Sequence, residues 1–234
     1  MTAPAVHRDT PAGWTAPAGG YDRWFDERWG RYAFAVETAT IVRAAGALDG
    51  RRVLDAGCGT GRFGTVFTRW GSLAIGVDPD ASMLAVARSR LAGRCVRGAS
   101  EDLPFPAETF DLTVAVTVLE FVIDPAAAVA ELARVTRPGG HIVLGALNPR
   151  SPWGLANHQR LRAGVWCHAR FLNRAALRSL AAPHGAATLH AALFAPGDLP
   201  APGLLGPALE ALGTMVPALG AFQVLTIDKP PADG

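Results

Sequence analysis

The apolar residues of the chain fall into two kinds of run, which alternate from residue 52 onward. Short apolar runs bounded by glycine, proline or aspartate are typical of strands in a buried parallel sheet. They predict seven strands, at 52–56, 73–77, 95–98, 110–117, 141–147, 188–194 and 221–227. The run at 110–117 is almost wholly apolar, so we expect this strand to be covered on both faces.

Between these runs the apolar residues recur with a period near 3.6, which indicates helices. The predicted helices lie at 33–48, 62–70, 81–91, 125–136, 173–183 and 204–212. Asp80 and Asp124 stand where a side chain can cap a helix, and Pro125 suits the first turn of one. Pro138-Gly139-Gly140 is expected to be a tight turn before the fifth strand. Strands alternating with helices predict a single doubly wound α/β sheet.

This layout predicts one domain over residues 21–229, a length that supports a full core. Residues 1–20 are rich in proline, alanine and glycine, have no apolar signal-peptide core, and are expected to be a disordered lead-in. Two segments are not needed for the sheet, 148–170 and 195–220, and such insertions commonly carry specificity. The second of them is almost uncharged. This favours an apolar substrate wall or a homodimer surface over a flap that touches a membrane.

The composition argues against several classes of function. Half of the residues are hydrophobic and 18% are charged, as in a globular protein, and no clean apolar run is long enough for an integral membrane span. The net charge is only +2, with 22 basic and 20 acidic residues that form no basic block, so no nucleic-acid partner is expected. None of the three cysteines lies in a C-x-x-C pair. This argues against a disulfide framework or a metal site and favours a reducing, cytoplasmic location.

The chemistry is concentrated at Val53–Gly61, which reads V-L-D-A-G-C-G-T-G. A strand that runs into a glycine-rich turn and then a helix is typical of a nucleotide site at the carboxyl end of a sheet. A dinucleotide fingerprint starting at Gly57 would require glycine where the chain has Arg62. Asp55 would also repel a pyrophosphate, whereas it suits a cationic ligand without phosphate such as S-adenosylmethionine. Asp78, 21 residues after Gly57, suits ribose hydroxyls in either ligand.

Four motifs in order extend this pattern: V-L-D-A-G-C-G-T-G, G-V-D-P-D-A-S-M-L, S-E-D-L-P-F-P-A-E-T-F-D and R-V-T-R-P-G-G-H. Together they resemble the class I S-adenosylmethionine-dependent methyltransferases, in particular the small-molecule branch that includes the ubiquinone and menaquinone methyltransferases. The resemblance covers about residues 51–147. It implies a mostly parallel, seven-stranded, Rossmann-like sheet with helices on both faces, S-adenosylmethionine as cofactor and S-adenosylhomocysteine as product.

The resemblance also implies roles for individual residues. The methionine part would be held by Asp55 and the backbone around Gly57, Cys58 and Gly59, and the ribose by Asp78. The adenine would lie against Pro79 and Met83, with Ser100 and Glu101 at its edge, and the sulfonium would lie between Thr117 and Leu119. Ala99 departs from the aspartate of many relatives. Simpler interpretations stay open: Asp55 as a cap of the loop, Met83 as core and Cys58 as a small loop residue.

Acceptor-side candidates lie outside these motifs. Glu120, where many relatives carry histidine, is a candidate catalytic base or a partner for a cationic acceptor; the alternative is a solvated loop residue. His158 and His168 are candidate bases in the 148–170 insertion, with a structural histidine as the alternative. Tyr21 and Trp24 are candidates for a lid over the sulfonium, or for plain helix packing. Trp153 and Trp166 would wall an apolar pocket or bury the insertion.

Three hypotheses follow. The first is methyl transfer from S-adenosylmethionine to a small organic acceptor by in-line displacement, mainly through positioning. The second is a protein that binds this cofactor without methylating. The third is an NAD-dependent oxidoreductase, against which Asp55 and Arg62 argue.

Overall fold

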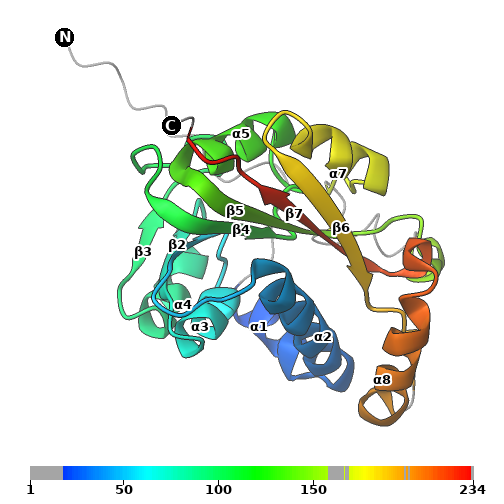
Figure 1. The fold of residues 1–234 in the computed structure, drawn as a ribbon. Helices are drawn as coiled ribbons and strands as arrows, with labels where there is room; N and C mark the ends of the chain where they lie inside the picture. The colour runs from blue at the N-terminus through cyan, green and yellow to red at the C-terminus, as the bar shows by residue number, and fades with distance from the viewer. Residues whose placement is uncertain (1–17, 158–165, 167–168, 198, 200, 233–234) are drawn as a thin grey trace.

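A single sheet of seven strands forms the frame of the protein. The structure is a computed structural model that describes residues 18–157, 166, 169–197, 199 and 201–232. The strands lie in the order β3-β2-β1-β4-β5-β7-β6, and β7 runs antiparallel to both of its neighbours (Figure 1). Their bounds are β1 (Arg52–Ala56), β2 (Leu73–Asp78), β3 (Cys95–Arg97), β4 (Phe110–Val116), β5 (Thr136–Leu147), β6 (Ala186–Ala192) and β7 (Phe222–Asp228). The seven predicted strands and the mostly parallel sheet are thus confirmed.

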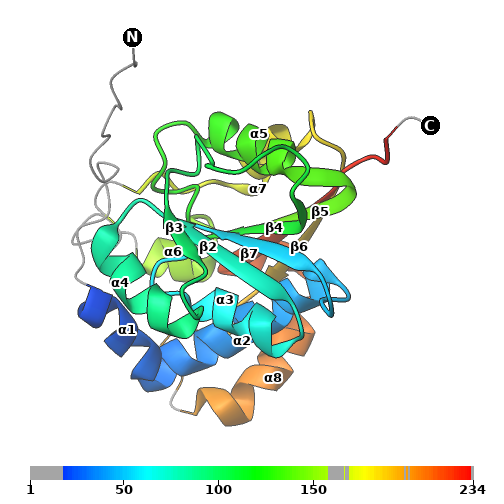
Figure 2. The same cartoon turned by 90° about the vertical axis from the view of Figure 1, so that its left-hand side faces the viewer.

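Helices cover both faces of this sheet, as predicted (Figures 1 and 2). One face carries α5 (Pro125–Val135) and α7 (Arg174–Ala181), and the other carries α2 (Arg28–Ala45), α3 (Arg62–Arg69) and α4 (Ala81–Arg90). The remaining elements are α1 (Ala18–Asp26), α6 (Pro152–Ala156), α8 (Pro202–Gly213) and the short 3₁₀ helix η3 (Pro217–Leu219). Asp80 and Asp124 cap α4 and α5 as expected, because each side chain accepts hydrogen bonds from two backbone N–H groups of its helix.

The sheet is buried because each face has its own apolar cluster. Leu132 of α5 and Leu177 of α7 belong to one cluster, and Ile41 of α2 and Phe67 of α3 belong to the other. β4 lies between β1 and β5, and six of its seven residues are buried. The apolar run predicted for this strand therefore reflects cover on both faces.

The N-terminal helices begin earlier than expected. Residues 18–20 belong to α1 instead of a disordered lead-in, and α2 begins at Arg28 instead of residue 33. Gly30 explains the join between the two helices, because a Cβ there would lie 1.9 Å from the carbonyl oxygen of Trp24. Only a residue without a side chain allows α1 to pack this closely on the start of α2.

The turn expected at Pro138-Gly139-Gly140 is wrong. These residues lie within β5, where the pairing register with β4 shifts between Phe110–Thr136 and Leu112–His141. The extra residues form a bulge, and Gly139 takes a φ of +69°. The bulge is held from the other side, since the Gly139 N–H is directed at the Lys229 and Pro230 carbonyls. The glycines do mark irregular backbone, but it is a bulge that is hydrogen-bonded to the residues just after β7.

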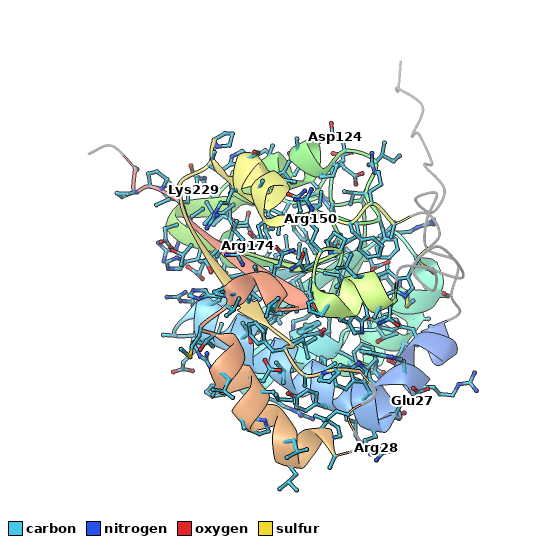
Figure 3. The ribbon with its side chains drawn as sticks, turned by 90° about the vertical axis from the view of Figure 1, so that its right-hand side faces the viewer. Glu27, Arg28, Asp124, Arg150, Arg174 and Lys229 are labelled. Carbon is cyan, nitrogen blue, oxygen red and sulfur yellow. The ribbon has the colours of Figure 1, made fainter. Side chains whose placement is uncertain are left out.

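Charged side chains on the face shown in Figure 3 lie on separate elements, among them Asp124, Arg174 and Lys229. Lys229 donates from Nζ to the carbonyls of Ala133 and Thr136, which joins the end of β7 to the last turn of α5. Among the residues that the structure describes, no helix combines the length and the apolar character that crossing a membrane requires.

Candidate functional site

The glycine loop between β1 and α3 lies at the carboxyl edge of the parallel strands. Gly57, Gly59 and Gly61 have φ values of +67°, +52° and +81°, a region that side chains other than glycine rarely adopt. A Cβ on Gly57 would lie 2.3 Å from Cγ2 of Val118, which follows β4. The loop therefore needs glycine both for its backbone and for its close approach to the β4 edge.

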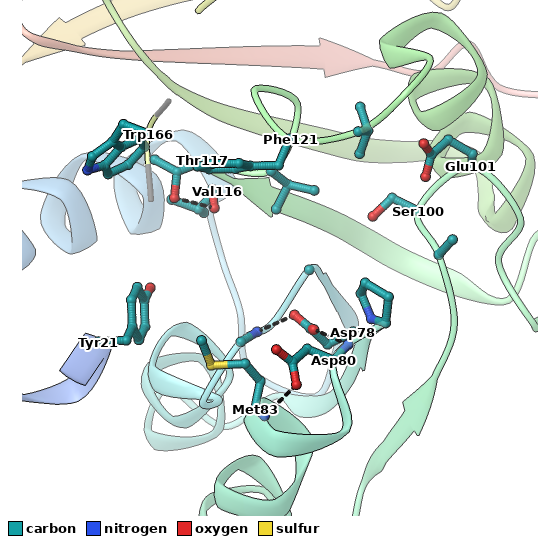
Figure 4. Close-up of a pocket in the computed structure, with 16 residues that line it drawn as sticks. Tyr21, Asp78, Asp80, Met83, Ser100, Glu101, Val116, Thr117, Phe121 and Trp166 are labelled. Atoms are coloured by element: carbon teal, nitrogen blue, oxygen red, sulfur yellow. Dashed lines mark hydrogen bonds between the residues drawn. The ribbon is translucent and has the colours of Figure 1, made fainter. Parts of the chain in front are cut away.

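This edge contains a cavity lined mainly by the ends of β2 and β4 and by the loops that follow β1 to β4, with Tyr21 of α1 and Met83 of α4 (Figure 4). Eight of the eleven residues expected to bind the cofactor line it, together with the lid candidate Tyr21. The eight are Gly57, Gly59, Asp78, Pro79, Met83, Ser100, Glu101 and Thr117. The lining also includes residues that were not predicted for the cofactor, notably Asp80, Phe121 and Trp166. We call this space the first cavity.

Asp78, the last residue of β2, is fixed by the loop that it faces. Its Oδ2 accepts from the Gly59 N–H and its Oδ1 from the Asp80 N–H, both at 2.8 Å. Burial raises the pKa of this carboxyl to about 6, although both hydrogen bonds act to lower it. A buried carboxylate with only backbone donors suits a ligand that brings further hydroxyl donors.

Asp55 lies behind the glycine loop. It is 2% exposed, is absent from the lining of the cavity, and accepts from the Gly64 N–H through Oδ2 at 2.8 Å. It thus caps the first turn of α3 behind the glycine loop, the simpler of the two interpretations. Burial raises the pKa of its carboxyl to about 7. When ionised, it adds negative potential close to Asp78 without touching the cavity.

Two more expected cofactor residues do not line the first cavity. Cys58 donates its N–H to the Val77 carbonyl, and its Sγ packs so tightly on β2 that a Cβ on Gly76 would lie 2.7 Å away. Burial raises the pKa of the Cys58 thiol, so it is not a nucleophile near neutral pH. Leu119 is 1% exposed and belongs to the core. Both are packing residues of the site.

Thr117 stands at the centre of the arrangement. It directly follows β4, and its φ of +51° is a strained value for a β-branched residue. The Thr117 N–H donates to the Gly145 carbonyl at 2.7 Å, and its Oγ1 donates to the Val116 carbonyl. Backbone strain of this kind clusters at functional sites, where the surrounding structure maintains it.

A second cavity, of about 300 Å³, opens on the other side of Thr117. Tyr21, Thr117 and Trp166 line both cavities, so they form the boundary between them. The acceptor-side candidates Tyr21, Trp24 and Trp153 all line the second cavity. Its other aromatic walls are Phe25, Trp29 and Phe63. Tyr21 and Phe25 pack edge to face with their ring centroids 5.0 Å apart.

Glu120, the candidate base, lines neither cavity. It is fully buried, and its Oε1 accepts from the Leu147 N–H at 2.9 Å, which joins the end of β4 to the end of β5. Burial raises the pKa of Glu120 to about 7. The interpretation as a solvated loop residue is therefore wrong, and the described structure places Glu120 outside the lining of both cavities.

Glu37, which the sequence interpretation missed, is the carboxyl that does line the second cavity. It shares the buried side of α2 with Gly30, Ala33, Ile41 and Ala45, a spacing visible in the sequence. An acidic residue on an apolar helix stripe was the available signal. The histidine candidates His158 and His168 lie outside the described residues.

Asp22 of α1 joins this helix to the glycine loop and to α3 and α4 through hydrogen bonds. The Asp22 carboxylate accepts from Thr60 Oγ1 at 2.8 Å, from Arg62 Nε at 2.8 Å and from Arg90 Nη2 at 2.7 Å. Arg62 also lies over the Phe25 ring, with Cζ 4.4 Å from the centroid. This cluster holds Tyr21 and Phe25 in place beside the two cavities.

Comparison with known proteins identifies the family. Residues 54–144 match the family described as Methyltransferase domain. The chain is 37% identical over 114 residues to the ubiquinone biosynthesis O-methyltransferase of Rhodopseudomonas palustris; the match covers 46% of this chain and 44% of that relative. It is 33% identical over 154 residues to an uncharacterised protein of Methanocaldococcus jannaschii, covering 65% of this chain and 70% of that one.

A solved structure resembles nearly the whole chain. It is an S-adenosylmethionine-dependent methyltransferase of Thermotoga maritima, named as a possible histamine N-methyltransferase. The TM-score is 0.73 at 25% identity, covering 90% of this chain and 95% of that one. With the motifs, the strand order and the glycine-lined cavity, these matches show that the chain belongs to the class I S-adenosylmethionine-dependent methyltransferases, as its resemblance to the ubiquinone methyltransferases implied.

Proposed function

We propose that the protein transfers a methyl group from S-adenosylmethionine in the first cavity to a small organic acceptor in the second. The observation that carries this proposal is the shared boundary: Tyr21, Thr117 and Trp166 line both cavities. A donor methyl at this boundary would face the acceptor space directly. Such a geometry suits an in-line displacement, in which the protein mainly positions donor and acceptor.

The residues of the first cavity fit the cofactor. Asp78 would accept the ribose hydroxyls, and Gly57 and Gly59 leave room for the backbone to approach the methionine part. Pro79 and Met83 would flank the adenine, with Ser100 and the backbone around it at the edge. The Glu101 Oε1 already accepts from the Ile123 N–H, so its second oxygen is the one that we assign to the adenine.

The charge of the site also suits a cation. Asp78 lines the first cavity and Asp55 lies behind the glycine loop, and the two carboxylates repel each other when both are ionised. When bound, S-adenosylmethionine supplies a methyl group on positively charged sulfur, which is open to displacement without a metal ion. Tyr21 and Trp166 bring aromatic rings to the boundary of the two cavities, and the face of such a ring favours a positive charge. Tyr21 and the aromatic walls behind it would also exclude water.

Names of relatives leave the acceptor open. The matched curated relative is named for O-methylation and the matched solved structure for a possible N-methylation. The match to the first of these spans less than half of its length, so its substrate is not assigned to this chain. A cytoplasmic location and a homodimer stay predictions; α8 exposes Leu204 and Leu212, and light scattering after size exclusion would measure the oligomeric state.

Calorimetry with S-adenosylhomocysteine and NAD, followed by a methyl-transfer assay on a panel of small acceptors, tests the proposal. We expect S-adenosylhomocysteine to bind and at least one acceptor to gain a methyl group. Tighter binding of NAD would favour an oxidoreductase. Binding of S-adenosylhomocysteine without transfer to any acceptor would favour a role other than methylation, and no binding of it would refute the proposal.

A further inference from the structure

Glu37 is the one carboxyl among the described residues that line the second cavity. Its side chain is supplied by the middle of α2, and the residue is only 8% exposed. The walls around it are aromatic or aliphatic, including Trp24, Phe25, Trp29 and Trp153. The cavity therefore combines a large apolar surface with one acidic group, the general form of a site for a small molecule with a single polar end.

No basic side chain of the described chain neutralises this carboxyl. Within the described residues, Glu37 takes part in no hydrogen bond or ion pair. Arg62 contacts the cavity wall at the Phe25 ring, but its guanidinium is paired with the Asp22 carboxylate. The charges that do act on Glu37 are unfavourable, since the Glu120 carboxyl raises its pKa. Tyr21, the other titratable group coupled to Glu37, is an un-ionised phenol because burial and nearby carboxylates raise its pKa.

An unpaired carboxylate in such a place destabilises the fold unless a ligand supplies its partner. Burial is the larger cause of the raised pKa of Glu37, which is about 8, and the ionised form gains most from a positively charged or N–H-bearing ligand. A second acidic side chain behind it, Glu120, strengthens this preference. Its Oε2 is buried without a hydrogen-bond partner in the described part of the chain.

We propose that the second cavity selects an amine attached to a flat, apolar body, with the Glu37 carboxylate accepting a hydrogen bond from the nitrogen. The aromatic walls would cover the apolar body, and their faces would favour a cationic head. This inference rests on the proposed function, because it names the acceptor class for the same site. Glu37 is here a specificity-determining residue in contact with the acceptor.

Paired probes test the proposal: benzylamine, phenethylamine and tryptamine, each compared with the alcohol that carries a hydroxyl group in place of the amine. Binding is measured by calorimetry on the protein saturated with S-adenosylhomocysteine. We expect at least one amine to bind tenfold or more tightly than its alcohol. In Glu37→Gln, which keeps the shape of the side chain, that preference should fall to less than threefold, with the alcohol bound as before.

Glu120→Gln is the matched control, since it removes a neighbouring buried carboxyl that does not line the cavity. It should lower the preference for the amine much less than Glu37→Gln does, because Glu120 does not contact the ligand space. The proposal is overturned if no amine binds more tightly than its alcohol, or if Glu37→Gln retains the preference. Prior titration with S-adenosylhomocysteine separates the two levels: failure to bind it refutes the proposed function, whereas normal binding without amine preference refutes only the role of Glu37.

Discussion

The substitution Asp78→Asn should have opposite effects on the stability of the ligand-free protein and on its affinity for the cofactor. The substitution keeps the size of a side chain that is 8% exposed and that accepts two backbone N–H groups at 2.8 Å each. It removes the charge and replaces one acceptor oxygen with an NH₂ group. One of the two N–H groups, of Gly59 or of Asp80, then loses its acceptor.

The effect on the ligand-free fold follows from the pKa. The pKa of Asp78 rises from 3.8 to about 6, chiefly through burial. Above the raised pKa, the ionised group costs the folded state about 3 kcal/mol, at about 1.4 kcal/mol for each pKa unit. Loss of one hydrogen bond to the backbone costs about 1–2 kcal/mol in the opposite direction. The balance at pH 8 is a net stabilisation of about 1–2 kcal/mol, and a chain of this size gains about 2–4 °C in Tm for each kcal/mol.

The effect on binding has the opposite sign. A hydrogen bond from a ribose hydroxyl to a carboxylate contributes about 1.5–3 kcal/mol. The loss of the charge at residue 78 weakens the proposed hydrogen bonds from the two ribose hydroxyls, so the affinity for S-adenosylhomocysteine should fall at least tenfold. The expected variant is therefore more stable alone and binds less.

Thermal unfolding of the ligand-free protein at pH 8 and calorimetry with S-adenosylhomocysteine measure the two effects. Asp124→Asn is the control, because Asp124 also accepts two backbone N–H groups but is exposed and outside both cavities. It should change neither quantity appreciably. A ligand-free Asp78→Asn protein that unfolds at lower temperature than the wild type, with unchanged affinity, would refute the reasoning.

Three further outcomes are expected. Four buried carboxyls at or near the two cavities have pKa values raised to about 6–8. They are Glu37, Asp55, Asp78 and Glu120. Between pH 5 and pH 8 they hold more protons in the folded protein than in the unfolded chain, so the Tm of the ligand-free protein should fall as the pH rises. A Tm that rises over this range would contradict the expectation. Gly57→Ala should abolish calorimetric binding of S-adenosylhomocysteine, since its Cβ meets Val118 at 2.3 Å; wild-type affinity would count against the assigned loop. Asp22→Ala should speed trypsin cleavage at Arg23 by releasing α1 from Arg62 and Arg90, and an unchanged cleavage rate would argue against the fastening role.

Much of the fold was predictable because its determinants are local. The apolar run that became β4 and the aspartates before α4 and α5 act within a few residues of their own position. The bulge at Gly139 was missed because its hydrogen bonds come from the distant end of β7. Local sequence indicates that glycine bends the chain, but does not indicate which strand lies beside the bend.

Most residues that line the first cavity were predictable for the same reason. The resemblance implied that Asp55 holds the methionine part, whereas in the structure its carboxylate accepts from the Gly64 N–H in the first turn of α3. The acceptor side required tertiary information. The spacing of Glu37 on α2 marks it as inward-facing, but whether the inward side meets core or an open cavity depends on segments more than 100 residues away, such as Trp153.

The two cavities draw on different parts of the chain. Apart from Tyr21 and Trp166, every residue that lines the first cavity falls within 57–122, whereas the second is built from 20–37 and 147–221, with Phe63 and Thr117 as the exceptions. The surfaces that we propose for donor and acceptor are therefore nearly separate in sequence although they adjoin in space. Exchange of the flanking segments between related proteins offers a route to new acceptors in which the central cofactor-binding unit is carried over intact.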